Sequence, residues 1–168
     1  GILLEHAAFI ASDLLPEPNV EQTAQKILQA QTYLNSLGFT AVHDFDRFES
    51  AEALLLLAER GQLKLKVTKN LPSEEVEKVI AGNWRQKLTP FIQPGWLKDF
   101  ADGALGPQSA AMMEPYEGSQ NRGMLLLKAS DLAKLGLQAA FAGWPLSVHA
   151  IGDLAVREVL DGFSLLRQ

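Results

Sequence analysis

Residues 38–44 read GFTAVHD, a glycine followed by a short aromatic and β-branched run that ends in two polar side chains. Such a run is typical of a buried strand, and a glycine in this place commonly ends the helix before it. That helix is predicted over residues 19–37, where Asn19 can cap the first turn and apolar residues recur with a helical period. The segment therefore predicts a helix that leads directly into a strand.

The same alternation continues along the chain. Besides residues 39–44, strands are predicted at 63–68, 96–101 and 146–150. Further helices are predicted at 51–60, from residue 73, at 130–142 and from about residue 153. Residues 102–128 hold four glycines and two prolines and predict a long loop. Strands that alternate with helices at this spacing predict an α/β fold made of parallel β/α units.

Composition narrows the function classes. The chain has 168 residues, 47% of them hydrophobic, and a formal net charge of −5, which excludes intrinsic disorder. No apolar run approaches the ~20 residues of a membrane span, so no membrane partner is expected. The acidic balance without a basic run argues against nucleic acid. The absence of cysteine excludes thiolate metal sites and fits a reducing compartment, which favours the cytoplasm.

Polar residues cluster at three predicted strand ends, where parallel α/β sheets bind ligands. These clusters are His43 with Asp44, Lys98 through Asp102, and His149 with Asp153. Because such ends converge on one face, the clusters are expected to share one site. No glycine-rich phosphate loop occurs, which argues against nucleotide binding and against a flavodoxin-like protein.

Each of these residues also has an ordinary structural interpretation. A histidine in an apolar strand, as His149 is, can be a satisfied core residue instead of a metal ligand. Lys98 can extend its amine to solvent, or it can be a buried neutral amine that forms a carbamate with carbon dioxide. The pair His43-Asp44 and the pair Asp102-Gly103 are both compatible with simple turns. Spacing alone leaves these alternatives open.

Three segments together resemble amidohydrolase family 3, a family of metal-dependent hydrolases that includes N-substituted formamide deformylase-like proteins. The segments are GFTAVHD at 38–44, WLKDFADGALG at 96–106 and VHAIGDLA at 148–155. Residues 109–116, with SAA and EPY, continue the second resemblance. The matches occur in the family's order, and they are specific as a set.

The resemblance implies a (β/α)8 metal-binding barrel, of which the four predicted strands correspond to about strands two to five. A complete barrel typically has ~250 residues. We therefore expect residues 1–168 to be a single partial TIM-barrel domain that is incomplete at both ends.

The family's metal ligands are an H-x-H pair on strand one, a lysine, often carboxylated, on strand four, histidines on strands five and six, and an aspartate on strand eight. The resemblance places Lys98 in the lysine position and His149 in the strand-five position. The other ligands have no counterpart in this chain. Asp102 is the candidate catalytic residue, and His43, Asp44 and Asp153 are candidates for substrate contact or for support of the ligands.

By resemblance, the parent enzyme binds one or two divalent ions, with zinc preferred, and hydrolyses C–N bonds of a small-molecule amide, formamide or cyclic ureide by metal-activated water. Two of about six ligands cannot hold an open zinc site, so this chain alone is expected to be inactive, with unmodified Lys98 and no tightly bound metal.

Two further expectations concern the isolated chain. Unpaired sheet edges predict a homo-oligomer. The alternative to a hydrolase fragment is a non-catalytic α/β binding domain that retains only the residues of the motifs.

Overall fold

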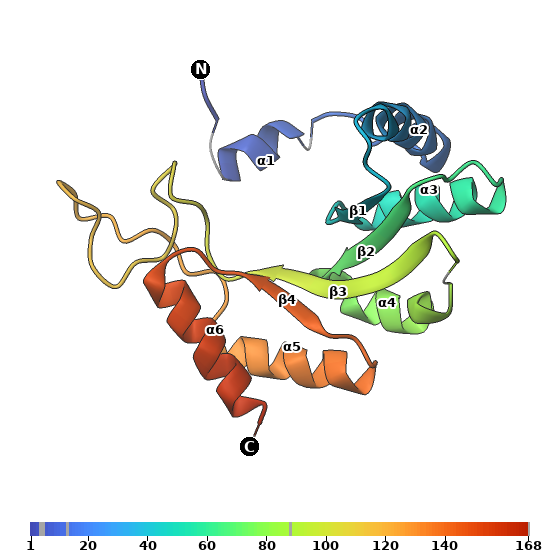
Figure 1. Cartoon of the computed structure of the whole chain (residues 1–168). Helices are drawn as coiled ribbons and strands as arrows, with labels where there is room; N and C mark the ends of the chain where they lie inside the picture. Colours follow the sequence, from blue (N-terminus) through green and yellow to red (C-terminus); the bar gives the residue numbers. More distant parts are fainter. Residues whose placement is uncertain (4–5, 13, 88, 168) are drawn as a thin grey trace. The chain divides into compact units, whose positions relative to one another are not determined.

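The computed structural model describes residues 1–3, 6–12, 14–87 and 89–167, without the side chains of His6 and Phe9. Figure 1 shows the helices, 3₁₀ turns and strands, which follow in the order α1 (His6–Ser12), α2 (Val20–Ser36), β1 (Ala41–Asp44), α3 (Phe48–Glu59), β2 (Lys66–Pro72), η1 (Ser73–Glu75), α4 (Val76–Ala81), η2 (Trp84–Gln86), β3 (Ile92–Phe100), α5 (Ala129–Phe141), β4 (Leu146–His149) and α6 (Asp153–Leu165). None of the helices within these residues is long and apolar enough to cross a membrane.

The strands form a sheet in the order β1-β2-β3-β4. Strand β1 pairs with β2 in parallel, with Asp44 opposite Lys69. Strand β2 pairs with β3 in parallel, with Pro72 opposite Lys98, and the register shifts between Lys69 and Leu71. The predicted α/β class with parallel β/α units is confirmed.

The chain divides into two compact units. The first, which we call the β1–β3 unit, consists of residues 18–98 and 142–145. The second, which we call the β4 unit, consists of residues 1–17, 99–141 and 146–168.

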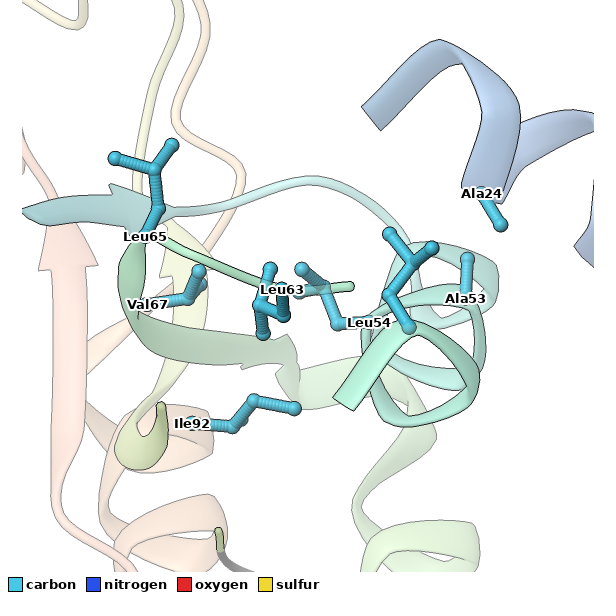
Figure 2. Packing of buried hydrophobic residues seen from close by; sticks show 8 residues of the cluster. Ala24, Ala53, Leu54, Leu63, Leu65, Val67 and Ile92 are labelled. Atoms are coloured by element: carbon cyan, nitrogen blue, oxygen red, sulfur yellow. The ribbon is translucent and has the colours of Figure 1, made fainter. Parts of the chain in front are cut away.

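The core of the β1–β3 unit lies between its sheet and two helices. Helix α2 begins with a capping box, in which the side chains of Asn19 and Gln22 each accept from the other's backbone N–H (2.9 and 3.0 Å). Helix α2 packs along α3. Figure 2 shows the buried cluster, which consists of Ala24, Ala53, Leu54, Leu57, Leu63, Leu65, Val67 and Ile92.

Strand β2 begins three residues later than predicted, at Lys66, because the side chain of Gln31 binds the segment before it. The Oε1 atom of Gln31 accepts from the backbone N–H groups of Lys64 (2.6 Å) and Leu65 (3.2 Å), and its Nε2 donates to the carbonyl of Gln62 (3.1 Å). These backbone groups are bonded by a helix side chain. The alternation of apolar and polar residues over 63–68 matches alternate burial of their side chains. Pairing with β1 begins only at Lys66.

Strand β3 begins earlier than predicted, at Ile92, although Pro94 and Gly95 are weak strand formers. The register shift in β2 accommodates them. At the shift, the buried side chain of Asn70 accepts from the N–H of Trp96 (2.9 Å) and donates to the carbonyl of Asp44 (3.1 Å). A Cβ on Gly95 would collide with the Asn70 side chain, so this close approach requires glycine.

The β4 unit packs helix α5 along α6, as Figure 1 shows. The N–H of Ala129, the first residue of α5, donates to the Glu158 carboxylate on α6 (2.7 Å). A small core of Ala101, Ala111 and Ala155 lies beneath partly buried aliphatic side chains. As predicted, the described residues 102–128 contain no helix, and their one isolated bridge joins Asp102 to Leu125.

Candidate functional site

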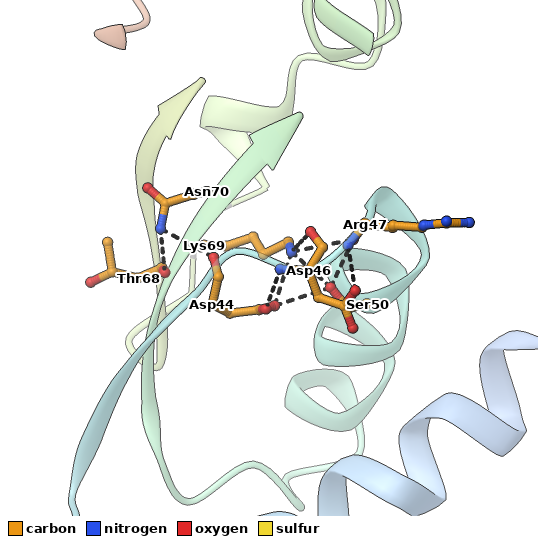
Figure 3. Close-up of polar contacts among 7 residues, drawn as sticks. All are labelled: Asp44, Asp46, Arg47, Ser50, Thr68, Lys69 and Asn70. Atoms are coloured by element: carbon orange, nitrogen blue, oxygen red, sulfur yellow. Dashed lines mark hydrogen bonds and ion pairs between the residues drawn. The ribbon is translucent and has the colours of Figure 1, made fainter. Parts of the chain in front are cut away.

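A buried ion pair lies where β1 ends, within the β1–β3 unit (Figure 3). The Nζ atom of Lys69 is 2.9 Å from the Oδ2 of Asp44, and Lys69 is only 4% exposed. The same amine donates to Ser50 Oγ (2.7 Å) and to the carbonyls of Asp46 (2.7 Å) and Arg47 (3.2 Å). One cation therefore holds the whole connection from β1 to α3.

Burial lowers the pKa of the Lys69 amine, and the carboxylate of Asp44 opposes this effect by stabilising the charged form. Asp44 also accepts from the N–H of Asp46 (2.8 Å) and from Ser50 Oγ (3.0 Å). Asp44, predicted for substrate contact or ligand support, thus has one oxygen bonded within its own loop and the other bonded by Ser50 of α3 and Lys69 of β2. It supports the end of β1.

Sequence reasoning missed Lys69, and a signal for it was present. Residues Leu63, Leu65 and Val67 are buried, and the same alternation places Lys69 on the buried side. The predicted strand stopped at residue 68, one residue too early for this inference.

His43 lies on the opposite side of β1 from the core and is exposed. Its ring stacks with Trp96 of β3, with centroids 5.9 Å apart, and with Phe45, at 6.4 Å. These contacts connect the end of β1 to Trp96 of β3, which lies two residues before Lys98.

Lys98 shares this side of the sheet. It is two residues beyond Trp96 on the same strand, so the two side chains project to one face. Lys98 is partly buried, whereas Leu97 between them is completely buried.

Asp102 is the centre of a buried hydrogen-bond network in the β4 unit and is 1% exposed. Its Oδ2 accepts from the N–H groups of Ala111 (2.9 Å) and Gly152 (2.7 Å), and its Oδ1 accepts from Ile151 N–H (3.0 Å). Predicted as catalytic, Asp102 here binds loop residues 109–111 to the start of α6. The Cβ of any other residue at 152 would collide with the carbonyl of Ala111, so Gly152 permits this approach.

His149, the last residue of β4, contacts the same network. Its Nε2 lies 2.8 Å from the carbonyl oxygen of Gly103 and 3.6 Å from the Oδ1 of Asp102. The ring also packs against Phe100, with centroids 5.3 Å apart, and the side chain is 27% exposed. His149 is thus a half-buried histidine with one nitrogen engaged by the protein.

Asp153, the first residue of α6, is exposed. Its Oδ1 accepts from the N–H of Met113 (2.8 Å) and from that of Leu154 (2.9 Å). A carboxylate at a helix N-terminus is electrostatically favoured there. Asp153 therefore fastens the long loop to α6.

The residues in each unit offer donor types that a divalent metal accepts. His149 supplies an imidazole in the β4 unit, which is a common metal ligand. Lys98, in the β1–β3 unit, carries an amine that would become an oxygen donor for a metal only as a carbamate. Within the described ranges, no three histidine or carboxylate side chains gather into a metal-binding group. The donor types fit a metal, whereas their number matches only part of a site.

Comparisons with known proteins show the family of the chain. The model of the amidohydrolase family matches residues 1–168. The Bacillus subtilis (strain 168) protein YtcJ, whose name describes it as an amidohydrolase, is 40% identical over 82 residues, which are 46% of this chain and 16% of YtcJ. The exoenzymes regulatory protein AepA of Pectobacterium carotovorum subsp. carotovorum is 30% identical over 172 residues, covering 98% of this chain and 37% of AepA.

The fold is also that of a solved enzyme structure. The crystal structure of an uncharacterized metal-dependent hydrolase from Pyrococcus furiosus superimposes with a TM-score of 0.82 at 29% identity. The match covers 95% of this chain and 34% of the hydrolase, so the chain spans about a third of that structure. Since the family model covers every residue, and the fold is that of a metal-dependent hydrolase, the chain belongs to the amidohydrolase family.

Proposed function

We propose that the protein to which this chain belongs hydrolyses C–N bonds of small amides, formamides or cyclic ureides. Membership of the amidohydrolase family supports hydrolysis in general. The choice of C–N bonds rests on the resemblance of residues 38–44, 96–106 and 148–155 to the formamide deformylase-like branch.

In this proposal, which rests on the family resemblance, Lys98 and His149 would each serve as a ligand of a divalent metal, and we propose zinc as that metal. A metal bound there supplies Lewis-acid activation of water. Lys98, as a carbamate, would contribute an oxygen ligand, and His149 would contribute a ring nitrogen. His43 and Trp96 would contact the substrate on the same side of the sheet as Lys98.

The observation that carries the proposal is the state of His149 at the end of β4. The ring is neither fully buried nor free to turn, because Nε2 is held by the carbonyl of Gly103 at 2.8 Å while the side chain stays 27% exposed. Ligand histidines commonly have one nitrogen fixed by a protein oxygen in this way.

The test uses the product of the complete gene that encodes this chain, loaded with Zn²⁺. We expect hydrolysis of N-benzylformamide, an N-acyl amine or hydantoin, and loss of that activity in Lys98→Ala and His149→Ala. Lys66→Ala, which removes an exposed lysine of β2, is the control. Cleavage of esters with none of these C–N substrates, or full activity of both variants, would contradict the proposal.

A non-catalytic role is the second candidate, and one observation favours it. Asp44, Asp102 and Asp153 all have backbone or side-chain partners that explain their presence without a reaction. The relative AepA is also named as a regulatory protein. This alternative would be favoured if the complete protein folds and binds the C–N compounds named above but hydrolyses none of them.

A further inference from the structure

One nitrogen of His149 faces two oxygen atoms of the chain, of which only the carbonyl oxygen is within hydrogen-bond distance. The carbonyl oxygen of Gly103 is 2.8 Å from Nε2, and the Oδ1 of Asp102 is 3.6 Å from it. Neither a carbonyl nor an ionised carboxylate can donate a hydrogen bond, so Nε2 must carry the proton. In a neutral imidazole, the lone pair is then on Nδ1.

The carboxylate of Asp102 determines this arrangement in two ways. Its charge lies in a buried position, where electrostatic attraction to an N–H group is stronger than in water. It also binds the N–H groups of Ile151 and Gly152, two and three residues after His149, and so keeps the end of β4 against Gly103.

We infer that Asp102 is a positioning residue that fixes His149 in the Nε2–H tautomer and leaves Nδ1 as its electron-pair donor. The use of that donor for a metal rests on the proposed function. The tautomer itself is a property of this chain without any metal, so the two ideas can fail separately.

The first test is ¹⁵N NMR of the imidazole groups in the 168-residue chain, at a pH where histidine is neutral. We expect a single Nε2–H form for His149, with a slowly exchanging proton. His43, whose exposed ring stacks on Trp96, is the internal control and should show the averaged signals of two exchanging tautomers. An averaged signal for His149, or an Nδ1–H form, would overturn the inference.

The second test replaces Asp102 by asparagine, which keeps the shape and removes the charge. We expect the Nε2 proton of His149 to exchange with water about tenfold faster, because the buried charge beside this N–H group has been lost. We also expect the tautomer ratio to shift. Asp153→Asn is the matched control, because Asp153 binds Met113 and Leu154. Unchanged exchange and tautomer ratio in a folded Asp102→Asn chain would overturn the role of Asp102.

If Asp102→Asn does not fold, Asp102→Glu takes its place, since it keeps the charge and moves it by one methylene. A changed tautomer ratio is again expected, and an unchanged ratio overturns the inference.

The results also separate this inference from the proposed function. A single Nε2–H tautomer of His149 in a protein without C–N hydrolase activity would reject the proposed function alone. An active enzyme with an averaged His149 would reject only the positioning role.

Discussion

At the scale of single residues, Lys69 shows how one buried cation organises a loop. Replacing it with methionine removes the cationic partner of Asp44 and one donor to each of the carbonyls of Asp46 and Arg47. Because the Asp44 side chain is still 21% exposed and partly solvated, we expect a loss of about 2–4 kcal/mol in unfolding free energy, measured by urea denaturation. Lys66→Met, on the exposed side of the same strand, should cost far less. Equal effects of the two substitutions would contradict this role for Lys69.

The same residue predicts a pH dependence. Burial lowers the pKa of Lys69 in the folded chain, so the unfolded chain binds more protons between that value and the ordinary lysine value of about 10.4. The unfolding free energy of the wild type should therefore rise with pH in this window, relative to that of Lys69→Met. Urea titrations of both chains at several alkaline pH values measure the difference. A difference that falls with pH would show that attraction to Asp44 outweighs burial.

For single residues, the sequence predicted positions near strand ends but not the contacts that the side chains make. The positions of His43, Lys98 and His149 near strand ends were predictable, because strand and helix periods are local properties of the sequence. Their partners were not predictable, because Gly103 meets His149 across 46 residues of chain. Whether Lys98 and His149 bind metal stays a prediction.

At the scale of elements, Gln31 sets where β2 begins. Gln31→Met should preserve packing in α2 while leaving the N–H groups of Lys64 and Leu65 without an acceptor. We expect a loss of about 1–3 kcal/mol in unfolding free energy and faster amide hydrogen exchange at those two residues. Gln29→Met, on the exposed side of α2, is the control. Unchanged exchange at both amides would show that Gln31 does not hold this segment.

The start of α6 depends on a glycine that loop backbone approaches closely. In Gly152→Ala, the new Cβ would collide with the carbonyl of Ala111 and separate Asp102 from its donors. We expect a loss of more than about 2 kcal/mol in unfolding free energy by thermal or urea denaturation. Gly106→Ala, in the same loop with open space around it, should be nearly neutral. A neutral Gly152→Ala would mean that the loop can move away without cost.

The sequence predicted the order of the main helices and strands correctly, but it predicted some of their boundaries less accurately. Helix α2 and strand β4 lie within about a residue of the predicted ranges, since capping and periodic burial specify them locally. The starts of β2 and β3 were displaced because Gln31 and Asn70, side chains distant in sequence, replace or redirect ladder hydrogen bonds.

At the scale of the whole molecule, β1 and β4 are the outer strands of the described sheet. Outer strands expose backbone groups that can pair with a second chain. We therefore expect the isolated chain to self-associate, with an average mass in sedimentation equilibrium that rises over an about hundredfold range of concentration. A monomer mass at every concentration would contradict this.

The isolated chain should also contain no metal, because its donors form only part of a site. We expect elemental analysis after dialysis to find less than stoichiometric zinc, and the native mass to lack the ~44 Da of a carbamate on Lys98. Stoichiometric zinc together with that added mass would contradict the expectation and would require ligands from a second chain.

The network around Asp102 also constrains when this part of the protein can form during synthesis. Gly152, which donates to Asp102, is 50 residues further along the chain. At a ribosomal rate of 5–20 residues per second, its donors emerge about 3–10 s after the carboxylate that binds them. For that interval the nascent loop of residues 102–128 has no anchor from β4 or α6, and it is exposed to chaperones and proteases. The segment that positions His149 can therefore form only after every residue of the β1–β3 unit has been synthesised.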